Sequence, residues 1–177
     1  KRLVNALLDE NSNITVLTRN IDKATQSLGA GINLITALTL ADIENVDTVI
    51  NLAGEPIADK RWSSKQKHKI CQSRWQITEQ LCALIKQANN PPSVFISGSA
   101  IGMYGRQLNE PKDEGFTRYY PEFTHEVCAT WEEIALSVAS DNTRIAILRT
   151  GVVLDANGGA LAKMLLPFKL GLGGKIS

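Results

Sequence analysis

The sequence predicts an α/β fold with a doubly wound sheet of parallel strands. Short runs of β-branched residues alternate with segments whose apolar residues recur every three or four positions, as in helices packed on a sheet. No tight hairpin signal separates these runs, so successive strands need right-handed crossovers and should pair in parallel. A chain of 177 residues has room for one sizeable core.

The amino-terminal half contains several short elements. A stripe formed by Leu3, Val4, Leu7 and Leu8 predicts a helix at the start of the chain. Gly29 favours the end of a second helix, because glycine adopts left-handed backbone angles without a steric penalty. We expect strands at residues 14–17, 32–35 and 48–52, and short helices at residues 21–28 and 39–46.

The carboxyl-terminal half contains longer elements. We expect helices at residues 63–88 and 127–138, strands at residues 94–96 and 144–148, and an irregular segment at residues 106–121. Pro91 ends the first of these helices, because the residue before a proline is restricted to extended angles. On the second helix, Glu132 and Glu133 are expected on an exposed face.

Three of the predicted strands end in small or hydrogen-bonding residues. Their exits are Asn51-Leu52-Ala53-Gly54, Ser97-Gly98-Ser99 and Arg149-Thr150-Gly151. Doubly wound sheets bind ligands outside the carboxyl ends of their strands, so these exits are candidates for a binding site. A buried strand that leaves through an ordinary Gly-Ser turn is the alternative. The polar and aromatic residues 59–62 fit either the lining of a substrate cleft or a solvated loop.

A fourth exit, Thr18-Arg19, bears on the choice of cofactor. Sheets of this kind that bind NAD carry an acid here to hold the ribose hydroxyls, whereas an arginine suits the 2′-phosphate of NADP. Arg19 therefore favours NADP over NAD. An ordinary exposed arginine at a strand end is the alternative.

The composition argues against several classes of function. Lysine and arginine (19) nearly balance aspartate and glutamate (18), so no strong field favours nucleic acid or an anionic membrane. Cys71, Cys82 and Cys128 are odd in number and widely spaced, which favours reduced thiols over disulfides or a metal site. No apolar run approaches the ~20 residues of a membrane span, and no signal peptide is recognisable. We therefore expect a cytoplasmic protein without a metal.

Several motifs resemble the YfcH-type epimerase family, an atypical branch of the extended short-chain dehydrogenases/reductases. They are residues 49–62 (VINLAGEPIADKRW), 97–105 (SGSAIGMYG), 148–154 (LRTGVVL) and 158–161 (GGAL), and the resemblance extends from Lys1 to Ile176. The resemblance implies a Rossmann-type fold in which a first strand and a GxxGxxG turn precede residue 1 and a substrate-binding region follows. We expect an NADP-binding domain at residues 1–157, and the start of the substrate-binding region at residues 158–177.

The catalytic residues that the resemblance implies are only partly present. Extended reductases combine a serine or threonine with a tyrosine and a lysine in YxxxK spacing, and the tyrosine exchanges a proton with the substrate. Ser99 lies at the matching serine position, but residues 122–128 (EFTHEVC), where YxxxK would fall, contain neither tyrosine nor lysine. The atypical branch shares this departure.

Tyr104 and His125 are the candidates to replace the missing pair. Tyr104 lies five residues beyond Ser99, and His125 lies near a helix start that should pass the same cleft. Histidine side chains exchange protons near neutral pH, which suits acid–base work. The alternatives are that the Tyr104 ring packs under its loop and that His125 is a solvated helix residue.

Together, the strand exits and the resemblance predict an NADP-binding epimerase or oxidoreductase of small molecules, with nucleotide sugars among the candidate substrates. The candidates for cofactor binding are Arg19, Asn51, Leu52, Ala53, Gly54, Ser97, Gly98, Thr150, Gly151 and Val152, and those for catalysis are Ser99, Tyr104 and His125. A non-catalytic NADP-binding sensor or partner protein, which lost YxxxK, is the alternative. The sequence leaves a homo-oligomer open.

Overall fold

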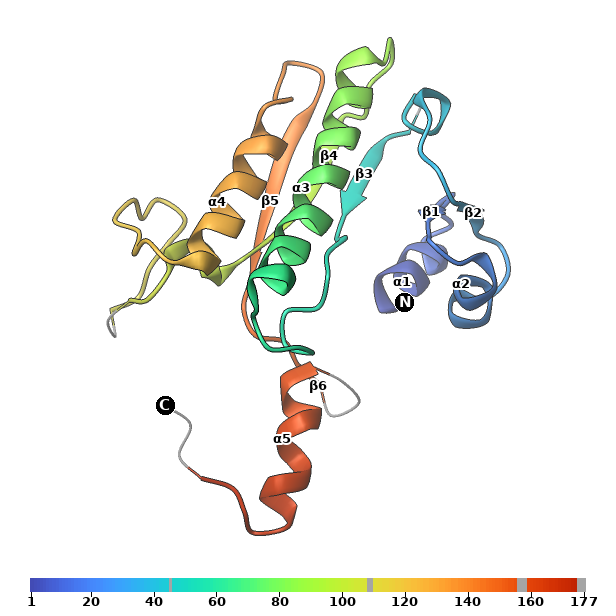
Figure 1. Cartoon of the computed structure of the whole chain (residues 1–177). Helices are drawn as coiled ribbons and strands as arrows, with labels where there is room; N and C mark the ends of the chain where they lie inside the picture. The colour runs from blue at the N-terminus through green and yellow to red at the C-terminus, as the bar shows by residue number, and fades with distance from the viewer. Residues whose placement is uncertain (45, 108–109, 156–158, 175–177) are drawn as a thin grey trace.

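The structure is a computed structural model, and it describes residues 1–44, 46–107, 110–155 and 159–174 (Figure 1). The domain boundary expected between residues 157 and 158 lies outside these residues, as does Ile176 at the end of the family resemblance. Within these ranges, no helix combines the length and the apolar character needed to cross a membrane.

From Arg2 to Thr150, helices and strands alternate along the chain as the sequence predicts, and a short strand and a helix that were not predicted follow. The helices are α1 (Arg2–Asp9), α2 (Ile21–Leu28), α3 (Ser64–Gln87), α4 (Phe123–Leu136) and α5 (Gly159–Lys169), with 3-10 turns η1 (Leu40–Asp42) and η2 (Ile101–Tyr104). The strands are β1 (Thr15–Leu17), β2 (Asn33–Ile35), β3 (Thr48–Asn51), β4 (Val94–Ala100), β5 (Arg144–Thr150) and β6 (Leu154–Asp155).

One predicted helix is shorter than expected. Residues 39–46 were expected to form a small helix, but the structure has only the 3-10 turn η1 there. Its turn is closed locally, because the Asp42 carboxylate accepts from the Thr39 backbone N–H at 2.8 Å and from the Thr39 hydroxyl at 2.6 Å. This capping box fixes the start of the turn. The chain has no room for a longer helix, because the Asp47 carbonyl already accepts from the Val94 N–H at 3.3 Å and β3 begins at Thr48.

The strands form two parallel sheets, which confirms the α/β class. The larger sheet has the order β3-β4-β5, and the smaller one pairs β1 with β2 (Figure 1). In the larger sheet, Asn51 lies opposite Ser97, and Ser99 lies opposite Arg149. Figure 1 shows β1, β2, α1 and α2 grouped to one side of the larger sheet.

The main core lies between the larger sheet and helices α3 and α4, which cover one of its faces (Figure 1). Phe95 at its centre is fully buried. The buried members of this cluster are Ile43, Leu81, Cys82, Ile85, Phe95, Ala135 and Val138. Because α3 and α4 pack on the same face, side chains from both helices meet those that end the strands.

Candidate functional site

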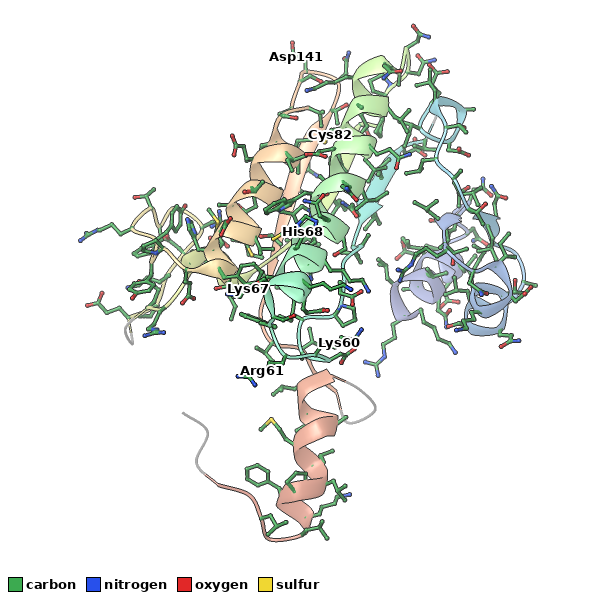
Figure 2. The ribbon with its side chains drawn as sticks, in the orientation of Figure 1. Lys60, Arg61, Lys67, His68, Cys82 and Asp141 are labelled. Carbon is green, nitrogen blue, oxygen red and sulfur yellow. The ribbon has the colours of Figure 1, made fainter. Side chains whose placement is uncertain are left out.

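The residues of the three predicted strand exits lie toward the carboxyl ends of β3, β4 and β5. Strands β4 and β5 are longer than expected, however, so that residues 97–99 and 149–150 belong to the strands themselves, as does Asn51 at the end of β3. β3, β4 and β5 are adjacent and parallel, so their carboxyl ends point the same way. In the loop after β3, Figure 2 shows Lys60 and Arg61 beyond the end toward which β3 points. Residues 59–62 are exposed, and the Trp62 indole N–H donates to the Ile57 carbonyl at 2.8 Å.

Asn51, at the end of β3, is buried and hydrogen-bonded on both sides of its amide. Its Nδ2 donates to Thr78 Oγ1 at 2.9 Å, and its Oδ1 accepts from the Ala53 backbone N–H at 3.2 Å. This amide therefore fixes the start of the loop, while residues 52–54 remain exposed. Behind the loop, Arg74 donates to the Glu55 carbonyl at 3.1 Å.

Ser97 and Gly98, on β4, face tightly packed neighbours. Ser97 is fully buried, and its hydroxyl lies 3.3 Å from the Gly98 carbonyl. A Cβ on Gly98 would lie 3.1 Å from the Trp131 ring and 3.3 Å from the Asn51 carbonyl oxygen. Glycine at position 98 thus lets the α4 indole pack directly on the strand.

Ser99 and Tyr104 are connected through Arg149, which belongs to a predicted strand exit, and through Glu132, which was expected on an exposed face. The Ser99 hydroxyl donates to Glu132 Oε1 at 2.5 Å, and Arg149 donates to both carboxylate oxygens, at 2.9 Å and 2.8 Å. Arg149 Nη1 also donates to the Tyr104 hydroxyl oxygen at 3.2 Å. The chain Ser99–Glu132–Arg149–Tyr104 is named here the Glu132 network.

The expected exposure of Glu132 is wrong, whereas Glu133 is exposed as predicted. Glu132 is only 4% exposed, because its side chain points at β4 and β5 and finds Ser99 and Arg149 there. The sequence held a usable signal, since Glu132 lies four residues after the buried Cys128. On β5, Arg149 continues the alternation of Ile145 and Ile147, which pack on the core.

His125 anchors the first turn of α4 to η2. Its Nδ1 lies 2.6 Å from the carbonyl oxygen of Met103, and its ring stacks on Tyr119 with the centroids 5.0 Å apart. The side chain is therefore partly buried and adjacent to the residue that precedes Tyr104, not solvated. This contact and the Glu132 network bring all three catalytic candidates around η2.

The remaining cofactor candidates are exposed. Arg19 lies in a bend two residues after β1, in the smaller sheet. At the end of β5, the Thr150 hydroxyl donates to the Ser99 carbonyl at 3.0 Å, and a Cβ on Gly151 would meet nothing within 4 Å. With Val152 two-thirds exposed, the β5 exit has open space for a ligand.

The three cysteines are free, as the sequence predicts, and all three are buried. Burial raises the pKa of Cys71 and Cys128, and it raises that of Cys82 from an ordinary 9.0 to about 11. Cys82, on α3 (Figure 2), lies with its Sγ 3.3 Å from the Ile134 carbonyl of α4. Among the described residues, no three His, Cys, Asp or Glu side chains are grouped so as to hold a metal ion.

We expect these thiols to react slowly in the folded protein. At pH 8, a thiol of pKa about 11 has roughly a hundredfold less thiolate than one of pKa 9.0, and thiolate is the reactive form. A colorimetric disulfide reagent should label all three cysteines within minutes in urea but label Cys82 at least a hundredfold more slowly without it. Rapid labelling of Cys82 in the folded protein would contradict its burial between α3 and α4.

Comparison with known proteins identifies the family. The family model described as "NAD dependent epimerase/dehydratase family" matches residues 1–163. An epimerase family protein of Staphylococcus haemolyticus is 33% identical over 175 residues, which are 99% of this chain and 58% of that protein.

Two solved structures are also similar. The human epimerase family protein SDR39U1, crystallised with NADPH, matches with a TM-score of 0.78 and 30% identity, over 98% of this chain and 57% of that one. UDP-glucuronic acid 4-epimerase from Bacillus cereus, in complex with UDP-glucuronic acid and NAD, matches with a TM-score of 0.65 over 84% of this chain and 51% of that one. At 19% identity, the second likeness shows the fold alone.

The chain spans a little under three fifths of the length of the Staphylococcus and human relatives. Its parallel α/β architecture agrees with the Rossmann-like fold of the human protein. The family resemblance drawn from the strand-exit motifs is confirmed by the model match, which covers more than nine tenths of the residues. The chain belongs to the NAD dependent epimerase/dehydratase family.

Proposed function

We propose that this chain binds NADP(H) along the carboxyl edge of β3, β4 and β5 and takes part in an oxidoreductase or epimerase reaction on a small molecule. Residues 1–157 would form the cofactor-binding domain, and residues 158–177 would begin the substrate-binding region. The observation that carries this proposal is the alignment of the carboxyl ends of three parallel strands at one edge, the usual ligand position in such sheets.

The residues at this edge fit a dinucleotide. The Leu52–Gly54 loop and the Thr150–Val152 exit are exposed, and a Cβ on Gly151 would meet open space. Asn51, Ser97 and Gly98 form the packed floor between these exits. Arg19 supplies an exposed guanidinium for the 2′-phosphate, and the human relative was crystallised with NADPH.

When bound, the nicotinamide would supply hydride transfer. The chain would supply the proton, and Tyr104 is the residue to which we assign this transfer. Ser99 donates to Glu132 and so holds the carboxylate that orients Arg149, while His125 holds η2 through the Met103 carbonyl. Of the three catalytic candidates, Tyr104 would therefore donate the proton, and Ser99 and His125 would position it.

A nucleotide sugar is the substrate class that we favour. The Bacillus cereus relative, which shares the fold, was solved with UDP-glucuronic acid. Such a ligand carries hydroxyl groups that can be oxidised to carbonyls by hydride loss, the reaction type that the proposed cofactor supports.

One observation favours a second function, a non-catalytic NADP-binding sensor. The Ser99 hydroxyl already donates to a buried carboxylate, at 2.5 Å, and the chain lacks YxxxK. A serine committed in this way does not orient a substrate hydroxyl. Cofactor binding is common to both functions, so it is tested first.

We expect the Arg19→Asp variant to lose about tenfold or more in affinity for NADPH but less than twofold for NADH. Hydrogen bonds to charged groups contribute about 1.5–3 kcal/mol, and 1.4 kcal/mol corresponds to tenfold. Nicotinamide fluorescence titrations of the purified protein measure both affinities. The matched control is Arg144→Asp, which reverses an exposed charge at the opposite end of β5 and should change neither affinity.

Equal effects of Arg19→Asp on the two cofactors would remove Arg19 from the phosphate site. If the protein binds neither NADPH nor NADH, the proposed function is overturned. If NADPH binds, its absorbance is followed against a panel of nucleotide sugars and carbonyl compounds in the protein and in Tyr104→Phe. Tight binding without turnover on the panel would favour the sensor, and turnover that Tyr104→Phe abolishes would favour the enzyme.

A further inference from the structure

The Arg149 guanidinium is held in one orientation by a buried carboxylate. Nε donates to Glu132 Oε1 at 2.9 Å and Nη2 donates to Oε2 at 2.8 Å, a two-pronged pairing that fixes the plane of the guanidinium. The side chains of Arg149 and Glu132 are 18% and 6% exposed. The direction of the third nitrogen, Nη1, is therefore set by Glu132.

That third nitrogen points at a phenol. Arg149 Nη1 donates to Tyr104 Oη at 3.2 Å, and the guanidinium carbon lies 5.2 Å from the centre of the Tyr104 ring. Nη1 also lies 3.4 Å from the Glu114 carbonyl. Among the residues that the structure describes, none accepts the Tyr104 hydroxyl hydrogen, which leaves that proton for transfer.

The backbone holds Tyr104 in place from the other side. Its carbonyl accepts from the Tyr120 N–H at 3.2 Å and from Gln107 Nε2 at 2.6 Å. The next residue, Gly105, has φ +63°, and a Cβ there would lie 2.3 Å from the Tyr120 carbonyl oxygen. Only glycine fits this turn, which directs the Tyr104 side chain toward β5.

We propose that Arg149 is the positioning residue that activates the Tyr104 hydroxyl. It would take the place of the lysine of the YxxxK motif, which this chain lacks. This inference rests on the proposed function for its place in a reaction. As Tyr104 loses its proton, negative charge develops on Oη beside a fixed cation, and a hydrogen bond between ionised partners is about twice as strong as one between neutral partners.

The charges around Tyr104 support this assignment. The pKa of Arg149 is raised above its ordinary value, chiefly because Glu132 accepts its N–H groups, so the guanidinium stays charged at every working pH. Other ionisable side chains near this segment include Lys112, 5.0 Å above the Phe116 ring that neighbours Tyr104, and Arg106, 5.6 Å from the Tyr120 ring. Glu114, whose carbonyl lies 3.4 Å from Arg149 Nη1, and His125 on α4 are also close. Among the described residues, only Arg149 donates a hydrogen bond to the phenol oxygen of Tyr104.

The activation can be measured without turnover. The probe is 4-methylbenzenesulfonyl fluoride, which forms an O–S bond to a phenol while the S–F bond breaks, fluoride leaves and the phenol proton passes to buffer. Peptide mass spectrometry follows all three tyrosines of the chain, Tyr104, Tyr119 and Tyr120. Tyr120 is the internal control, because it is 46% exposed whereas Tyr104 is partly buried.

We expect Tyr104 to be modified about tenfold faster than Tyr120. A hydrogen bond from a charged donor stabilises the developing phenolate, and the lower end of its usual strength corresponds to about tenfold in rate. Accessibility alone predicts the opposite order. Reaction of Tyr120 at an equal or faster rate in the unmodified protein would overturn the proposal, and this comparison needs no variant.

A double variant tests the dependence on Arg149. Removing Arg149 alone would leave Glu132 buried and unpaired, so Arg149→Met is combined with Glu132→Met to remove both charges. In this double variant, we expect the modification rate of Tyr104 to fall at least tenfold relative to that of Tyr120. The matched control is Lys112→Met, which removes a nearby cation that does not contact the phenol oxygen and should leave the ratio unchanged.

Arg149→Lys separates charge from geometry, because lysine lacks the fork that pairs with Glu132 and directs Nη1. We expect the modification rate of Tyr104 to fall at least threefold in Arg149→Lys as well. If the ratio of the Tyr104 rate to the Tyr120 rate is unchanged in the double variant, the proposal is contradicted. NADPH titration runs in parallel. If the protein does not bind NADPH but Tyr104 still reacts faster than Tyr120, only the proposed function is refuted. If it binds NADPH but Tyr104 does not react faster than Tyr120, only this inference is refuted.

Discussion

Replacing Glu132 with alanine is expected to lower the free energy of unfolding by about 3–5 kcal/mol. The carboxylate is 4% exposed, pairs with Arg149 through two hydrogen bonds and accepts a third from Ser99. Without it, the guanidinium is left without a carboxylate partner at a site where water has little access. Urea unfolding followed by circular dichroism measures the change as a lower midpoint.

The neighbouring residue provides the matched control for this prediction. Glu133→Ala removes the same side chain from an exposed position one residue along α4, and surface substitutions usually change stability by less than about 0.5 kcal/mol. The double variant Glu132→Met with Arg149→Met should recover much of the loss, because it leaves no unpaired charge. Equal midpoints for Glu132→Ala and Glu133→Ala would show that the ion pair does not stabilise the fold.

The second large effect is expected from Thr78→Val, which should lower the free energy of unfolding by about 2–4 kcal/mol. The Thr78 hydroxyl is fully buried, accepts from Asn51 Nδ2 and from Trp131 Nε1, both at 2.9 Å, and donates to the Arg74 carbonyl at 2.6 Å. Valine keeps the shape but leaves two buried donors without an acceptor, and each such group costs about 1–3 kcal/mol. This hydroxyl joins α3, α4 and the end of β3.

Thr78→Ser distinguishes the hydroxyl from the methyl group. Serine keeps the three hydrogen bonds and removes one methyl, so a loss of only about 1 kcal/mol is expected. Chemical unfolding of the two variants under identical conditions gives the comparison. If valine proves no more destabilising than serine, the hydrogen bonds to Asn51 and Trp131 contribute little, and the loop after β3 is held by other contacts.

Much of the architecture is predictable from the sequence because it depends on local signals. The apolar stripe of α3 and the prolines after it predict a helix that the structure has at Ser64–Gln87. Gly29, with φ +88°, ends α2 where expected. Alternation of strands and helices likewise predicts parallel pairing, which brings the three strand exits to one edge.

Other features depended on partners distant in the sequence. The segment after η1 becomes extended where the Asp47 carbonyl accepts from the Val94 N–H at 3.3 Å, which brings the chain onto β4. For His125 the sequence leaves a catalytic role and a solvated ring as alternatives, and the fold rules out the second by placing Nδ1 2.6 Å from the Met103 carbonyl, 22 positions earlier. Each outcome depends on which acceptor the fold brings within about 3 Å of a polar group.

What the sequence by itself determined is the family and the order of the helices and strands from α1 to β5, because glycines, caps and hydrophobic periodicity act over a few residues. Only the tertiary structure decided the chemistry at the carboxyl edge of the larger sheet. Glu132 is buried because β5 places Arg149, 17 positions further along the chain, within hydrogen-bonding distance. A buried charge needs a partner, and folding alone supplies it here.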